Sequence, residues 1–169
     1  FLIISTISDA FKKPKINFAR IISHFSFGFL IFFIGLNHNF SIEKDFNLKL
    51  GETKKIDNFN FELKDLKLQQ YDNYKAVIGE IQINDLSTKA KRTLNPEIRI
   101  YDNPQTLTYE ASIKTNFFRD YYLTMSNIDR SDYYNIKFQK KPLMIWIWIS
   151  VVMLSFGGFL SFIRNAKNN

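Results

Sequence analysis

The chain has 169 residues, 46% of them hydrophobic, which is room for about one domain of ordinary size. It contains no cysteine, so a thiol nucleophile, a CxxC pair and a cysteine-based zinc or iron–sulfur site are excluded. The net charge of +7 does not indicate nucleic-acid binding, because most of it comes from basic residues flanking two long uncharged segments: Lys12, Lys13, Lys15, Arg20, Arg164 and Lys167.

The first fifteen residues, FLIISTISDAFKKPK, are apolar at first and then basic. A secretory signal peptide has the opposite order, with its basic residues before the apolar run. We expect residues 1–15 to be the end of an upstream membrane helix followed by a cytoplasmic loop. The chain is then expected to be the C-terminal piece of a longer polytopic membrane protein.

Two apolar segments predict transmembrane helices over residues 16–39 and 142–163. Neither the run from Ile21 to Leu36 nor the run from Leu143 to Ile163 contains a charged side chain. A helix of about 21 residues is roughly 31 Å long, which is enough to cross a hydrocarbon core of about 30 Å. Both segments are therefore expected to span a bilayer.

The basic residues lie at the outer ends of these two helices. By the positive-inside rule, both termini are predicted to be cytoplasmic, including a tail over residues 164–169. The chain between the helices, residues 40–141, is then expected on the periplasmic side of a bacterial inner membrane. The mitochondrial inner membrane is the alternative location.

Between the helices the hydrophobic period changes to two, in short segments rich in β-branched and aromatic residues. Their residue ranges are 46–50, 59–68, 74–83, 97–101, 119–125 and 134–138. This pattern predicts an α + β membrane protein, in which transmembrane helices flank a compact antiparallel β-sandwich or small barrel on the periplasmic side. Alternating Lys and Glu on the strands indicates a solvated surface rather than an acid–base pair.

His24 lies inside the first apolar segment, and an ionisable side chain within a membrane span suggests a functional site. On a helix, His24 shares one face with Gly28, Ile31 and Gly35, and its glycines leave room for a flat group such as haem. The alternatives are a neutral histidine bonded to a neighbouring helix, and glycines that only pack helices. His38 lies about 21 Å further along the helix, too far to bind the same iron, so a second axial ligand is expected outside this chain.

Aromatic and small residues mark the second apolar segment. Trp146 and Trp148 follow a Lys-Lys-Pro sequence at its start, as in the aromatic belt of a membrane protein. Gly157 and Gly158, further along, favour close helix packing.

Over residues 20–164 a series of blocks, in order, resembles the C-terminal part of the CcmF family, the haem lyase subunits of system I cytochrome c maturation. The blocks are SHFSFGFLIFFIG, FSIEKDFNLKLGE, YDNYKA, LNPEIRIY, LTYEASI, RDYYLTM, KPLMIWIW and FGGFLSFIR. In that family the histidine that opens the first of these helices is an axial ligand of a b-type haem in the membrane. The resemblance therefore implies that His24 binds haem iron.

The resemblance also implies the activity of the longer protein. It receives haem from the chaperone CcmE and joins the haem vinyl groups to the CxxCH cysteines of apocytochrome c, with CcmH-type subunits as partners. The family's tryptophan-rich haem-handling segment lies upstream of the matched part, so this chain alone is not expected to perform the ligation.

Two other interpretations stay open. In one, the β domain is a non-catalytic, membrane-anchored platform for partner docking or assembly, and His24 is structural. In the other, the chain is a system II haem-handling protein of the ResB type, which also carries an outward β-rich domain.

Overall fold

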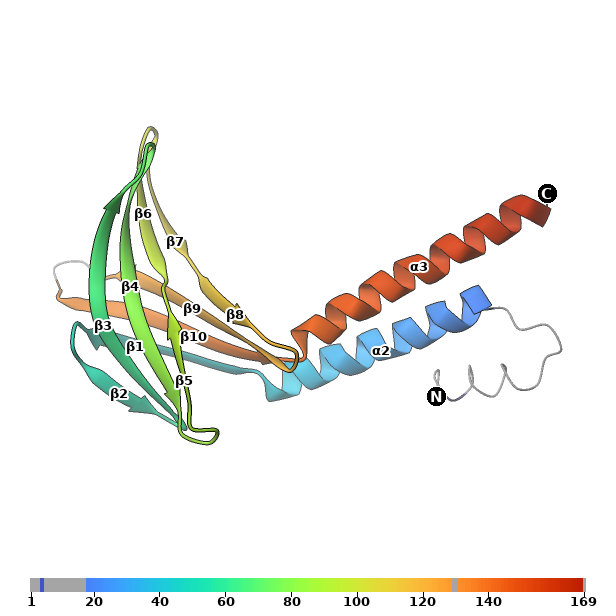
Figure 1. The fold of residues 1–169 in the computed structure, drawn as a ribbon, viewed down its shortest axis with the longest axis horizontal. Helices are drawn as coiled ribbons and strands as arrows, with labels where there is room; N and C mark the ends of the chain where they lie inside the picture. The colour runs from blue at the N-terminus through green and yellow to red at the C-terminus, as the bar shows by residue number, and fades with distance from the viewer. Residues whose placement is uncertain (1–3, 5–17, 129–130, 169) are drawn as a thin grey trace. The chain divides into compact units, whose positions relative to one another are not determined.

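The computed structural model describes residues 4, 18–128 and 131–168 (Figure 1). The chain divides into two compact units. A helical unit contains the chain up to Ser41, the tetrapeptide Asn116–Arg119 and the chain from Lys141 onward, whereas a sheet unit contains Ile42–Thr115 and Asp120–Lys140. The expected upstream helix end and loop at 1–15 lie outside the described residues, apart from Ile4.

The described elements are two long helices and ten strands. In chain order they are α2 (Phe18–Phe40), β1 (Ile42–Lys49), β2 (Thr53–Ile56), β3 (Phe59–Gln70), β4 (Tyr74–Asp85), β5 (Ala90–Leu94), β6 (Glu97–Asp102), β7 (Gln105–Glu110), β8 (Ser112–Thr115), β9 (Arg119–Asn127), β10 (Tyr133–Pro142) and α3 (Met144–Asn168).

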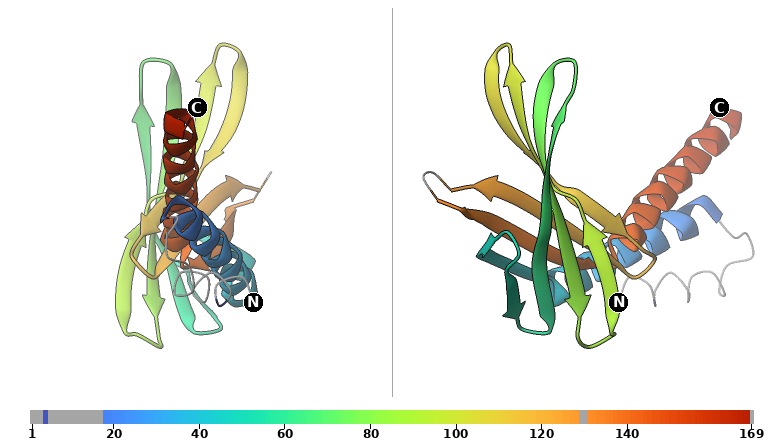
Figure 2. Two further views of the ribbon diagram at one scale, coloured as in Figure 1. Left: turned by 90° about the vertical axis from the view of Figure 1, so that its right-hand side faces the viewer. Right: turned by 60° about the vertical axis from the view of Figure 1, so that its left-hand side comes forward.

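Helices α2 and α3 lie side by side in the helical unit (Figures 1 and 2). The segments Phe18–Phe40 and Met144–Arg164 are long and apolar enough to cross a membrane, at 23 and 21 residues. These lengths correspond to about 35 and 32 Å of helix, close to the thickness of a bilayer core. Helix α3 continues beyond the predicted span, through Arg164 to Asn168.

The contact between the two helices uses small and aromatic side chains at spacings of three or four residues. On α2 the contact face, here called the helix seam, consists of Ala19, Ser23, Ser26, Phe33 and Asn37. It meets Trp146, Ser150 and Gly157 of α3 and Pro142 just before that helix. This heptad-like spacing is the geometry in which neighbouring helices pack at a small crossing angle.

Two serines are buried in the helical unit, Ser26 and Ser150, with exposed fractions of 0% and 2%. Each hydroxyl donates a hydrogen bond to a carbonyl four residues earlier, Ser26 to Ile22 at 2.7 Å and Ser150 to Trp146 at 2.8 Å. Because the hydroxyls are satisfied within their own helices, they are buried without an unpaired donor.

In the sheet unit the strands form two sheets. One has four strands in the order β1-β10-β9-β8, and the other has the order β2-β3-β4-β6-β7 with β5 also paired to β4. Strands β1 and β10 run antiparallel from the pair Ile42 and Lys140 onward, and β3 and β4 run antiparallel from Phe59 and Asp85. The predicted antiparallel β-sandwich is confirmed.

The core of the sandwich comes from alternate positions of strands in both sheets. Its buried residues are Phe46, Leu48, Phe59, Phe61, Leu63, Ile81, Ile83, Leu94, Ile98, Tyr121, Leu123, Met125, Ile136 and Phe138. Successive side chains of a strand point to opposite faces, so this spacing of two places every core residue on the inner side of its sheet.

Four strands lie outside the predicted segments, namely β2, β5, β7 and β8. Strands β2, β7 and β8 have no fully buried residue, and all three are edge strands of their sheets. Strands β2 and β8 are too short to show a hydrophobic period, and the alternating Leu107 and Tyr109 of β7 are exposed rather than buried. Backbone pairing with β3, β6 and β9 forms them instead.

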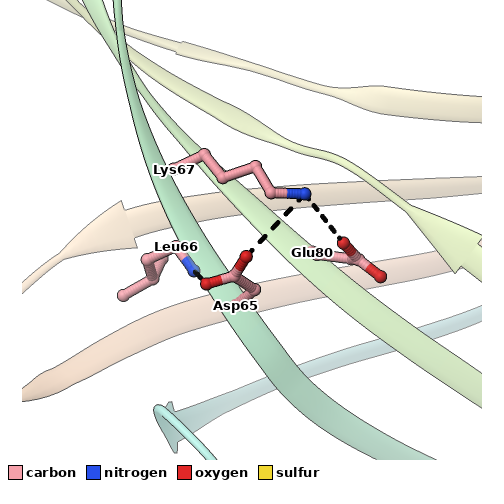
Figure 3. A network of polar contacts seen from close by, with 4 residues as sticks. All are labelled: Asp65, Leu66, Lys67 and Glu80. Atoms are coloured by element: carbon pink, nitrogen blue, oxygen red, sulfur yellow. Dashed lines mark hydrogen bonds and ion pairs between the residues drawn. The ribbon is translucent and has the colours of Figure 1, made fainter.

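Charged residues on the outer face of β3 and β4 neutralise one another at the surface. Figure 3 shows Lys67 between two carboxylates, with its Nζ 3.2 Å from Glu80 Oε2 and 3.7 Å from Asp65 Oδ2. Asp65 also accepts a hydrogen bond from the backbone N–H of Leu66 at 2.8 Å. The side chains of Asp65 and Lys67 are more than half exposed, so these acidic residues belong to a solvated surface.

Candidate functional site

His24 lies on α2 on the side away from the helix seam. With 3.6 residues per turn, His24, Ile31 and Gly35 lie about 150° around the helix axis from the seam. The imidazole is exposed, and so is Ile31, at 56%. At Gly35 an added Cβ would meet no atom within 4 Å. This face of α2, which we call the histidine face, is therefore open rather than packed against α3.

The surroundings of His24 are apolar. Phe27 and Phe32 flank the histidine face with exposed fractions of 43% and 53%. An imidazole nitrogen offers a lone pair to a metal ion, while a flat apolar surface with a glycine gap suits a planar hydrophobic group. A planar hydrophobic group could therefore lie against this face, and haem ligation by His24 stays a prediction.

The described part of the chain has no cluster of metal-binding side chains around His24. Among residues 4, 18–128 and 131–168, no three His, Cys, Asp or Glu side chains come close enough to share an ion. His38 is exposed in the last turn of α2, about 21 Å from His24 along the helix axis. A second axial ligand outside this chain therefore stays a prediction.

The glycines and tryptophans of α3 have different surroundings. A Cβ on Gly157 would lie 2.9 Å from the backbone nitrogen of Ser23, whereas a Cβ on Gly158 would meet nothing within 4 Å. Of the two expected packing glycines, only Gly157 is in the helix contact. Trp146 stacks on Phe33 with ring centres 5.5 Å apart, while Trp148 is 62% exposed.

A second candidate surface lies in the sheet unit, where the blocks YDNYKA and LNPEIRIY meet. Tyr74 and Tyr101 are cross-strand partners on β4 and β6, with ring centres 5.2 Å apart. Tyr71 stacks on Tyr74 at 4.5 Å, and the Arg99 guanidinium lies 5.0 Å from the centre of the Tyr74 ring. These four residues form what we call the tyrosine–arginine cluster.

Neighbouring side chains stabilise the charged form of Arg99. Its Nε is 2.8 Å from Glu97 Oε2, and this hydrogen bond, followed by one with Tyr101, raises the pKa of the guanidinium. Partial burial, opposed by the nearby Arg99, raises the pKa of the Tyr74 hydroxyl. The cluster therefore combines three tyrosine rings with an arginine that is ion-paired to Glu97, and Tyr and Arg are residue types that often dominate protein interfaces.

The sequence blocks alone do not reveal this cluster, because Tyr71 and Arg99 are far apart in the chain. The signal that predicts it is the register between β4 and β6, which places Tyr74 opposite Tyr101. A one-residue shift of either strand would move its side chain to the other face of the sheet.

Comparison with known proteins supports the family suggested by the sequence. The profile of a family described as "CcmF C-terminal beta-sandwich" matches residues 39–142. Relatives named "Cytochrome c-type biogenesis protein CcmF" from Haemophilus influenzae and Escherichia coli are 26% and 25% identical, covering 88% and 91% of this chain.

A solved structure of "Cytochrome c Heme Lyase CcmF" shares the fold, with a TM-score of 0.65 and 14% identity over 84% of this chain. The chain spans 23% and 24% of the two CcmF relatives and 24% of the solved chain, about a quarter of their length. The family match covers more than half of the chain and favours the CcmF resemblance over a ResB-type protein. This chain belongs to the CcmF family and corresponds to its C-terminal β-sandwich region.

Proposed function

We propose that this chain is the membrane-anchored C-terminal part of a CcmF-type haem lyase subunit. Helices α2 and α3 cross the inner membrane, with the sheet unit on the periplasmic side and the other helix ends in the cytoplasm. The lengths of the two helices and the basic residues beside their outer ends support this arrangement. The whole protein would attach haem to apocytochrome c, receiving it from CcmE with CcmH-type subunits as partners.

Within that protein, we propose that His24 is an axial ligand of a b-type haem in the membrane. The observation that carries this proposal is the position of His24 on the open histidine face, away from α3. His24 would supply the imidazole lone pair, Gly35 the clearance, and Phe27 with Ile31 an apolar wall that excludes water. When bound, the haem would supply a one-electron centre for reducing incoming haem.

The test is the visible spectrum of the full-length protein carrying His24→Ala. We expect the b-type haem absorbance to fall by at least several-fold at equal protein level, because removing an axial ligand weakens metal binding. Added imidazole should restore part of the signal by occupying the vacated position.

His38→Ala is the matched control, since it removes the same side chain from the same helix. We expect it to leave the haem spectrum unchanged. A fully loaded and unaltered spectrum in the His24→Ala protein would show that His24 is not a ligand, and the docking function below would then be favoured.

The second candidate function is partner docking by the sheet unit, with His24 in a structural role. The tyrosine–arginine cluster favours it, because Tyr and Arg side chains held at a surface often contribute most of the affinity of an interface. The partners to be tested are CcmE, CcmH-type subunits and apocytochrome c, each measured separately.

Arg99→Ala is expected to weaken binding of the recognised partner by about tenfold, equivalent to roughly 1.4 kcal/mol, without changing the haem content. Lys75→Ala is the control, because Lys75 is exposed on β4 next to Tyr74 but lies outside the cluster. The measurement is the dissociation constant of each partner in detergent or nanodiscs. Equal affinities of the Arg99→Ala protein and the wild type for all three partners would rule out the cluster as their docking site.

A further inference from the structure

The turn between β8 and β9 carries two adjacent phenylalanines at its tip. Phe117 and Phe118 are 50% and 63% exposed, at a position where polar residues and glycine are usual. We call the tetrapeptide Asn116–Arg119 the phenylalanine tip. Half or more of each of these two large apolar residues is therefore exposed at the surface.

The phenylalanine tip is a well-defined turn. The side-chain oxygen of Asn116 accepts hydrogen bonds from the backbone N–H groups of Phe118 and Arg119, at 3.0 and 2.9 Å. The N–H of Asn116 donates to the carbonyl of Arg119 at 3.1 Å. These three bonds fix the turn so that it projects both rings.

The tip is attached to the beginning of α3. The N–H of Leu143, a residue with a positive φ of 58°, donates to the carbonyl of Phe118 at 2.9 Å. The Phe117 ring contacts Trp146 edge to face, with centres 4.9 Å apart. Although the tip belongs to a β-hairpin, these contacts make it part of the helical unit.

Trp146 links the tip to both helices. Its indole contacts Phe117 and also stacks on Phe33 of α2. Trp146 lies in the first turn of α3, where a membrane span would begin and where tryptophan favours the interface between lipid and water. The tip is therefore at the depth at which the proposed span leaves the membrane.

We propose that the phenylalanine tip inserts into the outer interface of the phospholipid bilayer and forms a third membrane contact beside α2 and α3. This inference rests on the proposed function, because it requires α3 to cross the membrane. The exposed ring of Phe118 would enter the region of the acyl chains near the headgroups, next to the lipid-facing surface of the helical unit. We infer phospholipid as the binding partner because the tip is attached to the start of α3, whose exposed side would face lipid in the proposed membrane span.

The basic residues beside the phenylalanine tip also favour contact with phospholipid. In the sequence KTNFFR, Lys114 and Arg119 stand on either side of the two aromatic residues. Long basic side chains at this depth reach toward lipid phosphates while their methylene groups stay in apolar surroundings. An aromatic tip between two cations is thus suited to an anionic membrane surface.

The experiment measures the depth of a fluorescent label in the full-length protein, reconstituted in nanodiscs of phosphatidylethanolamine and phosphatidylglycerol. Because this region has no cysteine, Phe118→Cys introduces a single labelling site in it once cysteines elsewhere in the protein are replaced. Quenching is compared between lipids carrying a nitroxide at the headgroup and lipids carrying it on the acyl chain. We expect the Phe118 label to be quenched at least twofold, more strongly by the shallow nitroxide.

Two reference labels make the result interpretable. Trp148→Cys labels the exposed side of α3 and should be quenched if this helix spans the membrane. Asp72→Cys labels an exposed residue of the β3–β4 turn in the sheet unit and is the comparison for quenching that is not specific to the tip. If Phe118→Cys does not fold, Thr115→Cys next to the turn provides the same measurement, with quenching expected from the headgroup nitroxide.

Three results would overturn the proposal. Quenching at Trp148 without quenching at Phe118 would refute insertion of the tip and leave the proposed membrane span intact. Equal quenching at Phe118 and Asp72 would show that the effect is not specific to the tip. Absence of quenching at Trp148 would refute the membrane span, and the inserted tip with it. If the tip instead binds a partner protein, the label at Trp148 would be quenched and the label at Phe118 would not.

Discussion

Asp85 shows how one buried charge can serve the fold of the sheet unit. Its exposed fraction is 2%, and its Oδ1 accepts hydrogen bonds from the backbone N–H groups of Ser87 and Thr88 at 3.0 and 3.2 Å. The carboxylate thereby closes the turn that follows β4. It also lines a cleft of about 390 Å³ with Lys89 and Lys91, but its hydrogen bonds assign it to the turn.

The pKa of Asp85 is the balance of opposing causes. Burial raises it, but the hydrogen bonds from Thr88 and Ser87, together with the charge of Lys140, outweigh burial and leave the pKa below its ordinary value of 3.8. A carboxyl with a lowered pKa stabilises the folded protein above its ordinary pKa. That contribution is lost as the pH falls through the folded-state value.

We therefore expect Asp85→Ala to lower the free energy of unfolding by about 1–2 kcal/mol at pH 7, through loss of the turn's hydrogen bonds. The difference from wild type should hold above pH 4 and shrink as the pH falls below 3.8. Urea unfolding of the detergent-solubilised protein at several pH values measures both effects. A destabilisation that stayed constant down to the most acidic pH would assign the cost to packing rather than to the charged hydrogen bonds.

At the scale of the elements, the two adjacent glycines of α3 differ in what they contribute. Gly157 lies in the contact with α2, whereas Gly158 affects only the intrinsic stability of its own helix. A Cβ on Gly157 would approach the backbone of α2, at 2.9 Å from Ser23 N and 3.2 Å from Ala19 O. Backbone atoms cannot rotate away, so the helices would have to separate. The space beside Gly158 is open.

Gly157→Ala is expected to destabilise the helix pair by about 1–3 kcal/mol, the usual cost of overpacking a close contact. Gly158→Ala should be neutral or stabilise α3 by up to about 1 kcal/mol, because alanine is the better helix former. Thermal unfolding of both variants in the same detergent compares them directly. If the two changed stability equally, the close approach at Gly157 would not contribute to the packing.

At the scale of the whole molecule, the sequence predicts the helices from two long uncharged apolar segments and the main strands from a hydrophobic period of two. The strands with buried faces, such as β3 and β9, alternate clearly, and the two uncharged segments coincide with α2 and α3. The edge strands β2 and β8 are only four residues long, and the alternating Leu107 and Tyr109 of β7 are exposed. These three strands therefore lack a buried face and form by hairpin pairing with the adjacent strands β3, β6 and β9.

The candidate sites, too, could be predicted only in part from the sequence. The grouping of His24 with Ile31 and Gly35 follows from helical periodicity alone, whereas the openness of that face depends on which side α3 covers. The two phenylalanines of the phenylalanine tip are visible in the sequence, but their attachment to α3 is shown only by the hydrogen bond from Leu143 to Phe118 and the contact of Phe117 with Trp146. Residue spacing thus predicts which side chains share a face of a helix or strand. Contacts between segments distant in sequence determine what that face packs against.

The pairing of β1 with β10 bears on how this architecture could arise and change. The chain enters the sheet unit at Ile42 and leaves it at Lys140, and these two residues are partners in one ladder. Asn37 and Pro142, just outside, are joined by a hydrogen bond of 2.5 Å. The two ends of this inserted stretch therefore already meet, but the stretch also supplies Asn116–Arg119 to the helical unit. Its gain, loss or exchange during evolution would leave the helix connection in place and would change the contacts of the phenylalanine tip with α3.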